Sequence, residues 1–344
     1  MSRRQGGARF AFVYVALVAA ATGCAGKAPR AAEVAKAGTA VEAPPDSGLS
    51  SPVGREARSV GRSIAATERA ILRNDWAVAK ANVDDALAAD PKSVRALYYA
   101  GLCDEKFGKR REAESHYRQS LAEDATFPES AINLSALLIE AERAKEAVAV
   151  LLPAAKAWPS DLLLQENLGL AASFAKNHET AVRAFQRLDK AGALHRETRM
   201  TYADSLLALD KKADALAVLR AGVREVGGEE AEIVPYVTLL FGAGAPEDAK
   251  DLIDRALKTA RSATLLVLRA NAKLSLNDAK GAVADLEAAT TLAPQDAITA
   301  FALAEARDVL GQRAEAKKAF TAALRLGLDG ELAEKAKKRV EQLP

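Results

Sequence analysis

Aromatic residues make up only 5% of this 344-residue chain, which also has just two cysteines, three histidines and no strong excess of charge. The apolar content is therefore mostly Ala, Leu and Val, which favours helices packed closely through small side chains. The 48 basic and 46 acidic residues are spread without a basic block, so the phosphates of nucleic acid would meet no clustered positive face. Two cysteines far apart in sequence exclude a disulfide framework. We predict an all-α protein that does not bind nucleic acid.

Residues that carry chemistry are equally sparse. His116, His178 and His195 occur singly and have no Cys, Asp or Glu partner at metal-ligand spacing, so we interpret them as surface residues. Cys103 has no histidine nearby and is expected to be a partly buried packing residue. There is no Gly-rich phosphate loop, and Gly227-Gly228 is followed by acidic residues. The sequence predicts no enzyme activity, no cofactor, no metal site and no small-molecule substrate.

The N-terminus has the pattern of an export signal. Arg3, Arg4 and Arg9 precede an uncharged apolar run of 12 residues, Phe10 to Ala21, which ends shortly before Cys24. The run is shorter than the roughly 20 residues of a membrane-spanning helix. We predict a signal peptide at residues 1–23. Two alternatives stay open: an ordinary cleaved signal peptide in which Cys24 is incidental, and an uncleaved apolar anchor.

The segment Ala21-Thr22-Gly23-Cys24 resembles the lipobox of bacterial lipoproteins, with Ala21 where Leu is usual. The resemblance implies that Cys24 is acylated and becomes the first mature residue, so that the membrane is contacted through a lipid anchor. Ala25 is not the Asp that retains such lipoproteins in the inner membrane, which implies the periplasmic face of the outer membrane. Residues 24–57 are rich in Ala, Pro, Gly and Ser and are predicted to form the lipidated cysteine and a flexible tether.

An alanine returns through the rest of the chain at intervals of 34 residues, with a single interval of 33. Four and seven residues after it come a larger apolar residue and, in most copies, another small one, which places all three on one face of a helix. Upstream of each such helix lies a second apolar helix, with a small residue such as Gly101 or Gly169 where the two helices would cross. The repeated alanines are Ala79, Ala113, Ala147, Ala181, Ala215, Ala249, Ala282 and Ala316.

This period and pattern resemble the tetratricopeptide repeat, a pair of antiparallel helices. The resemblance implies a right-handed α-solenoid of about eight units over residues 58–330, in which each unit packs only on its neighbours. Residues 331–344 are predicted to form a capping helix. The units are expected to begin near residues 60, 94, 128, 162, 196, 230, 264 and 297.

In the tetratricopeptide repeat family, the first helix of each unit lines a concave groove through its second, fifth, ninth and twelfth positions. Carried over, this register gives a largely apolar lining, which predicts binding of a hydrophobic or amphipathic peptide or helix from another protein. The alternative for any one of these residues is that it fills the core between units. The predicted partner-binding residues are Tyr98, Leu102, Ile132, Ile139, Leu170, Met200 and Phe241.

Two functions are compatible with these features. The first is a non-catalytic scaffold on the cell envelope that assists assembly of a pilus, secretion or motility complex, as similar exported repeat lipoproteins do. The second is an accessory protein that holds a peptidoglycan enzyme through the same groove. The sequence does not choose between them.

Overall fold

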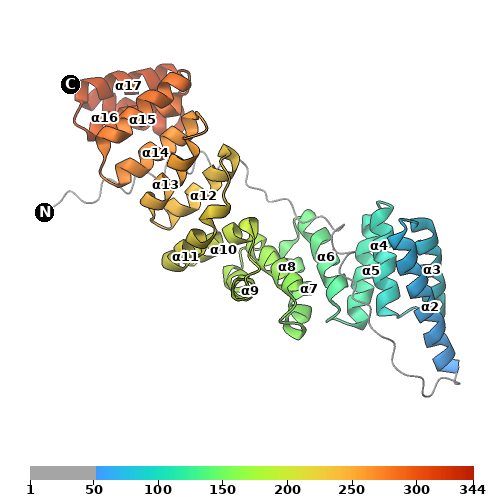
Figure 1. Ribbon diagram of the computed structural model, residues 1–344. Coiled ribbons are helices and arrows are strands. Elements are labelled where there is room, and N and C mark those ends of the chain that lie inside the picture. The colour runs from blue at the N-terminus through green and yellow to red at the C-terminus, as the bar shows by residue number, and fades with distance from the viewer. Residues whose placement is uncertain (1–51) are drawn as a thin grey trace. The chain divides into compact units, whose positions relative to one another are not determined.

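The computed structural model describes residues 52–344, which form a succession of α-helices joined by short turns (Figure 1). Seventeen α-helices occupy this range, with no strand among them, so the all-α prediction is confirmed. None of the helices in this part of the chain is long and apolar enough to cross a membrane. The predicted signal peptide, Cys24 and the tether up to residue 51 lie outside the described residues.

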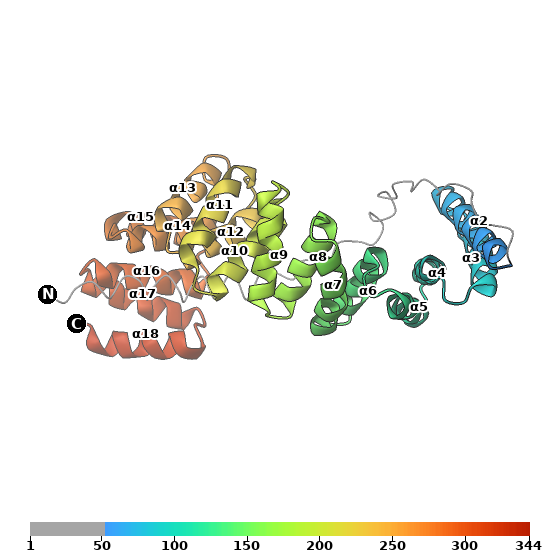
Figure 2. The same ribbon diagram turned by 90° about the horizontal axis from the view of Figure 1, so that it is seen from below.

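The helices fall into two compact blocks, each built from consecutive antiparallel pairs that follow one another in chain order (Figures 1 and 2). The N-terminal block, within residues 52–194, has four pairs. Its helices are α2 (Pro52–Leu72), α3 (Trp76–Ala89), α4 (Val94–Lys106), α5 (Arg110–Glu123), α6 (Pro128–Glu140), α7 (Ala144–Ala157), α8 (Leu162–Phe174) and α9 (His178–Lys190).

The C-terminal block, residues 195–344, has four further pairs and a last single helix. A short 3-10 turn, η2 (Val223–Glu225), follows its second helix. The α-helices are α10 (Arg196–Ala208), α11 (Lys212–Gly222), α12 (Glu230–Gly242), α13 (Pro246–Ala256), α14 (Ala263–Ser275), α15 (Ala279–Leu292), α16 (Ala297–Val309), α17 (Arg313–Arg325) and α18 (Gly330–Gln342).

These pairs coincide with the repeat read from the sequence, and the chain is an all-α solenoid of eight helix pairs with a capping helix. The first helices begin within one residue of the expected unit starts, except at α2. That helix begins at Pro52, so the boundary placed between residues 57 and 58 falls inside a helix. Pro52 occupies the first helical position, where an N–H has no partner inside the helix, so proline is tolerated there. The helix therefore includes residues 52–57 of the segment that was expected to be tether.

The periodic alanines form the contact between the two helices of each pair. All eight are 0% exposed, and the larger residue four positions later is buried in every pair. Two pairs bring their helices together at glycine: a Cβ on Gly101 or Gly169 would lie 2.5 Å from the ring of Tyr117 or Phe185, respectively. The expectation that small residues permit close helix crossing is confirmed at these two pairs.

The turn inside each pair has its own period. One residue per turn has a positive φ, which ends the first helix in a left-handed conformation and reverses the chain. Glycine, which adopts this conformation without steric penalty, occupies only three of the eight positions. The eight residues are Asn74, Gly108, Glu142, Lys176, Asp210, Gly244, Asn277 and Gly311.

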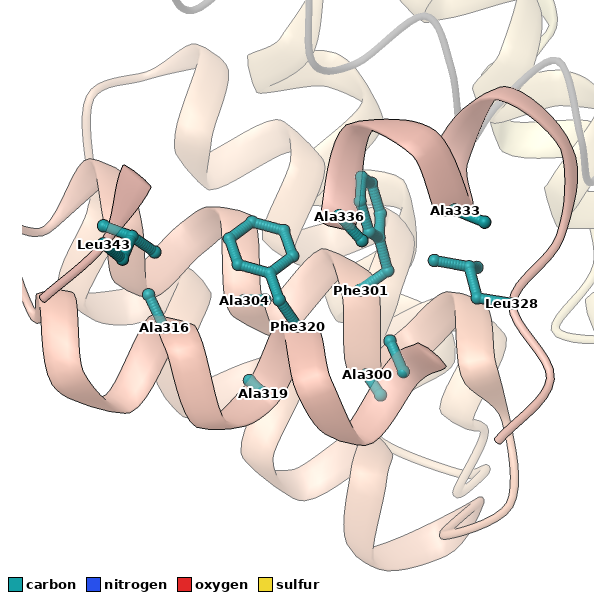
Figure 3. Packing of buried hydrophobic residues seen from close by; sticks show 11 residues of the cluster. Ala300, Phe301, Ala304, Ala316, Ala319, Phe320, Leu328, Ala333, Ala336 and Leu343 are labelled. Carbon is teal, nitrogen blue, oxygen red and sulfur yellow. The ribbon is translucent and has the colours of Figure 1, made fainter. Parts of the chain in front are cut away.

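The cap closes the apolar end of the C-terminal block. Ala333 and Ala336 of α18 pack with Phe301 and Phe320 of the last pair, and Leu343 closes the cluster (Figure 3). The rings of Phe301 and Phe320 meet edge to face with centroids 5.6 Å apart. The lysine-rich outer side of α18 faces water, as expected for the open end of a solenoid.

Candidate partner-binding surface

The first helices of successive pairs lie closer together than the second helices do. Within the N-terminal block α2 contacts α4 and α6 contacts α8, and within the C-terminal block α10, α12, α14 and α16 contact one another in sequence. Contacts between successive second helices are fewer among the described residues. These contacts place the first helices on the inner side of the local bend where they are found.

The fifth position of the first helix proves to be largely a packing position. Tyr98 is 7% exposed and Ile132 5% exposed. The ring of Tyr98 lies 6.1 Å from that of Tyr117 in α5 and 5.9 Å from that of Phe127, the residue just before α6. Tyr98 and Ile132 thus fill the core between pairs, the alternative left open for each residue. Their direct contact with a partner stays a prediction.

The ninth and twelfth positions are different, because they are only half-buried. Leu102, Ile139 and Leu170 have this exposure on α4, α6 and α8, three successive first helices of the N-terminal block. Phe241, at the twelfth position of α12 in the other block, is also half-buried. Met200 of α10 is half-buried as well, although it occupies the fifth position. We call the ninth and twelfth positions of α4, α6 and α8 the first-helix surface; they are Leu102, Glu105, Ala136, Ile139, Leu170 and Ser173.

The first helices of the N-terminal block differ in charge, because α2 and α4 carry basic residues, Arg95 and Lys106 on α4 among them, whereas α6 and α8 do not. Neither α6 nor α8 contains a Lys, Arg or His, whereas Glu129, Glu140 and Glu166 lie on them. The second helices α5, α7 and α9 all carry basic residues. The first-helix surface is consequently mostly apolar and contains one carboxylate, that of Glu105, with no basic side chain on its α6 and α8 parts.

A chain of hydrogen bonds joins three helices beside this surface. The Tyr117 hydroxyl donates to Oε2 of Glu105 over 2.7 Å, and Nδ2 of Asn133 donates to the Tyr117 oxygen over 3.2 Å. Burial raises the pKa of the Glu105 carboxyl above its usual range, and the bond from Tyr117 only partly opposes this. Burial likewise raises the pKa of Tyr98 and Tyr117, so both phenols stay protonated at neutral pH.

The sequence pattern alone does not indicate this chain of bonds. Tyr117 occupies the large apolar position of its helix, and its hydroxyl was the available signal, because a buried tyrosine generally needs a hydrogen-bond partner. Which partner it would find depends on the helix crossing, which the sequence alone does not define.

The residues expected to be inert are placed as follows. Cys103 is a free, fully buried thiol, and burial raises its pKa to about 11, which fits the packing role expected of it. His116 differs from its prediction as an unpartnered surface residue: it is half-buried, and its Nδ1 lies 2.7 Å from Oδ2 of the buried Asp104. The two residues are on the paired helices α4 and α5, so the pairing follows from the fold. Within residues 52–344 no group of three or more His, Cys, Asp or Glu side chains could hold a metal ion.

The fold defines the class as an all-α helical-repeat protein whose architecture is similar to that of tetratricopeptide repeats. The sequence pattern of the tetratricopeptide repeat family matches residues 263–296, which are the pair α14 and α15. No curated protein sequence matches the chain significantly.

Several solved structures are similar to this chain. The chain is similar to the structure of Naa15/Naa10 bound to HypK-THB, with 18% identity, a TM-score of 0.53, and coverage of 83% of this chain and 46% of that one. It is also similar to a tetratricopeptide repeat protein from Parabacteroides merdae, with 16% identity, a TM-score of 0.44, and coverage of 83% and 99%. Pseudomonas aeruginosa pilF follows with 21% identity, a TM-score of 0.40, and coverage of 70% and 94%. At these identities the likeness concerns the fold.

Proposed function

We propose that this chain is a non-catalytic scaffold that binds a peptide or helix of another protein on its first-helix surface. The observation that carries the proposal is the contrast in burial between two sets of apolar residues. The large residues between paired helices are fully buried, whereas Leu102, Ile139 and Leu170 on successive first helices keep part of their side chains exposed. A row of half-exposed apolar side chains on one bent face offers anchor points for an amphipathic segment.

The proposal includes export and anchoring. The apolar run that ends shortly before Cys24 supports lipidation of that cysteine and attachment to the periplasmic face of an outer membrane. The scaffold would then act in assembly of a pilus, secretion or motility complex. A peptidoglycan enzyme held on the same surface is the alternative, and the identity of the bound protein separates the two.

The binding face is tested by affinity purification of the full chain from detergent-solubilised membranes. Ile139→Arg places a charge on the first-helix surface, and Leu152→Arg places the same charge on α7, where Leu152 is 44% exposed. We expect Ile139→Arg to lose the co-purifying protein and Leu152→Arg to retain it. Retention in both variants, with both folded, would contradict binding on this face.

The anchor has a separate test. Cys24→Ala removes the only thiol that the lipobox resemblance assigns to acylation. We expect the unchanged chain to partition with membranes and the variant to appear in the soluble periplasmic fraction. Equal membrane retention of both forms would support an uncleaved apolar anchor instead.

A further inference from the structure

The charges on and beside the first-helix surface indicate which kind of side chain the bound segment would present to it. Glu105 lies on α4, and Glu129 and Glu140 lie at the two ends of α6. Glu140 is ion-paired with Arg110 of α5. No Lys or Arg forms an ion pair with Glu105 in the described part of the chain, although Arg110 exerts a weaker pull on it. The half-buried Glu105 carboxylate is thus held by a neutral hydroxyl and lacks a cation of its own.

Asn133 extends the hydrogen-bond chain of Glu105 and Tyr117 into the core, where its side chain also interacts with the Tyr98 hydroxyl. The Asn133 side chain is 1% exposed. The Tyr117 hydroxyl has a single proton, which goes to Glu105, so Asn133 must turn its NH2 group toward the Tyr117 oxygen. Its Oδ1 is then left buried with no hydrogen-bond donor among the described residues. A buried acceptor without a donor is rare in native proteins and calls for explanation.

The carboxylate also carries a stability penalty. Because burial raises the pKa of Glu105, the charged form is disfavoured in the folded chain relative to the unfolded one. An uncompensated charge kept in the fold at the expense of stability is typical of a functional site.

The side chains around Glu105 determine what kind of ligand group could compensate its negative charge. Leu102 precedes Glu105 by one turn of α4, and Ile139 lies at the equivalent twelfth position of α6, both half-buried. A ligand here meets apolar side chains and a carboxylate together. That combination matches a long aliphatic stem with a cationic end, since such side chains bury the stem and expose the charge.

We propose that the first-helix surface between α4 and α6 binds an arginine or lysine of the partner segment against the Glu105 carboxylate, with flanking apolar residues of that segment on Leu102 and Ile139. The inference rests on the proposed function and adds the charge of the bound segment. Tyr117 and Asn133 act as positioning residues, because they orient the carboxylate and leave its negative charge uncancelled.

The test uses two short amphipathic helical peptides labelled with fluorescein, binding to the full purified chain and measured by fluorescence anisotropy. One carries a single central arginine among leucines, and the other has citrulline, which is neutral and nearly isosteric, in its place. The protein variants are Glu105→Gln and Glu112→Gln. Glu112 is exposed on the second helix α5, so its loss changes net charge equally but away from the surface.

We expect the arginine peptide to bind the unchanged chain about tenfold more tightly than the citrulline peptide, as a charge-assisted hydrogen bond provides. Glu105→Gln should abolish this preference, whereas Glu112→Gln should change the affinity by less than about twofold. Circular dichroism verifies that both variants are folded.

Three results overturn the inference. If both peptides bind the unchanged chain equally, the surface accepts amphipathic segments without reading charge, and only the further inference fails. If both variants lower the affinity for the arginine peptide equally, only the net charge of the chain matters, and again only the further inference fails. If neither peptide binds, the proposed function fails with it.

Discussion

The close approach of paired helices at glycine gives a stability prediction with a defined magnitude. In Gly169→Ala the new Cβ would lie 2.5 Å from Cε1 of Phe185, where an ordinary contact needs at least 3.4 Å. Phe185 is fully buried, so its ring cannot move away without disturbing its other neighbours. Overpacking of a core costs about 1–3 kcal/mol, and alanine recovers about 0.5–1 kcal/mol of helix propensity. We expect a net loss of up to about 2.5 kcal/mol in the free energy of unfolding.

The matched control is Gly61→Ala in α2, because Gly61 is exposed and an added Cβ there meets nothing within 4 Å. This variant should gain about 0.5–1 kcal/mol from helix propensity alone. Urea unfolding followed by circular dichroism at the helix band gives both values, and Gly101→Ala against Tyr117 repeats the test at a second pair. If Gly169→Ala proves as stable as Gly61→Ala, the reasoning about close helix crossing is refuted.

Three further predictions concern turns and charges. Glu142→Gly should raise the urea midpoint, because a non-glycine residue at φ 60° is strained by about 1 kcal/mol; an unchanged or lower midpoint contradicts this. Burial alone raises the pKa of Asp254, but the ion pairs with Lys250 and Arg269 outweigh burial and lower it. The stabilising contribution of Asp254 is therefore present above about pH 4 and lost as the pH falls through the lowered pKa. Asp254→Asn should be less stable than the unchanged chain at pH 7, and this difference in stability should narrow in acid. Thermal melts over a pH series measure the difference, and a difference that does not change with pH excludes the ion pairs as its source. Glu105 has the opposite sign, since burial raises its pKa: Glu105→Gln should be at least as stable as the unchanged chain at pH 7, and acidification through the raised pKa should favour the unchanged chain. A clear loss of stability in Glu105→Gln at pH 7 would show that the carboxylate is a structural necessity.

The repeat made the fold predictable, because each unit needs only its neighbours and a fixed period specifies which side chains meet. Ala79 and its seven equivalents marked the face on which paired helices meet. Pro91 and Pro159 each lie two residues after the end of a second helix, α3 or α7, and so marked where those helices end. The residues with positive φ in the turns follow the same period. The sequence does not reveal this at Glu142 and Lys176, because neither residue type favours the left-handed conformation.

The surface was less predictable than the fold. The family register treats Tyr98 and Leu102 alike, yet Tyr98 is buried by Phe127 across the pair boundary while Leu102 stays half-exposed. The difference depends on the distance between successive first helices, which sequence spacing does not specify. The pairing of His116 with Asp104 was missed for the same reason, since it joins two helices across their crossing.

The central claim is that a protein partner binds the first helices, and site-specific photo-crosslinking in the native cell tests it most directly. A photoreactive phenylalanine analogue replaces Ile139 on the first-helix surface or Leu152 on the exposed side of α7. We predict a crosslink to one discrete protein from position 139 and none from position 152. A crosslink to the same protein from position 152 alone would contradict it.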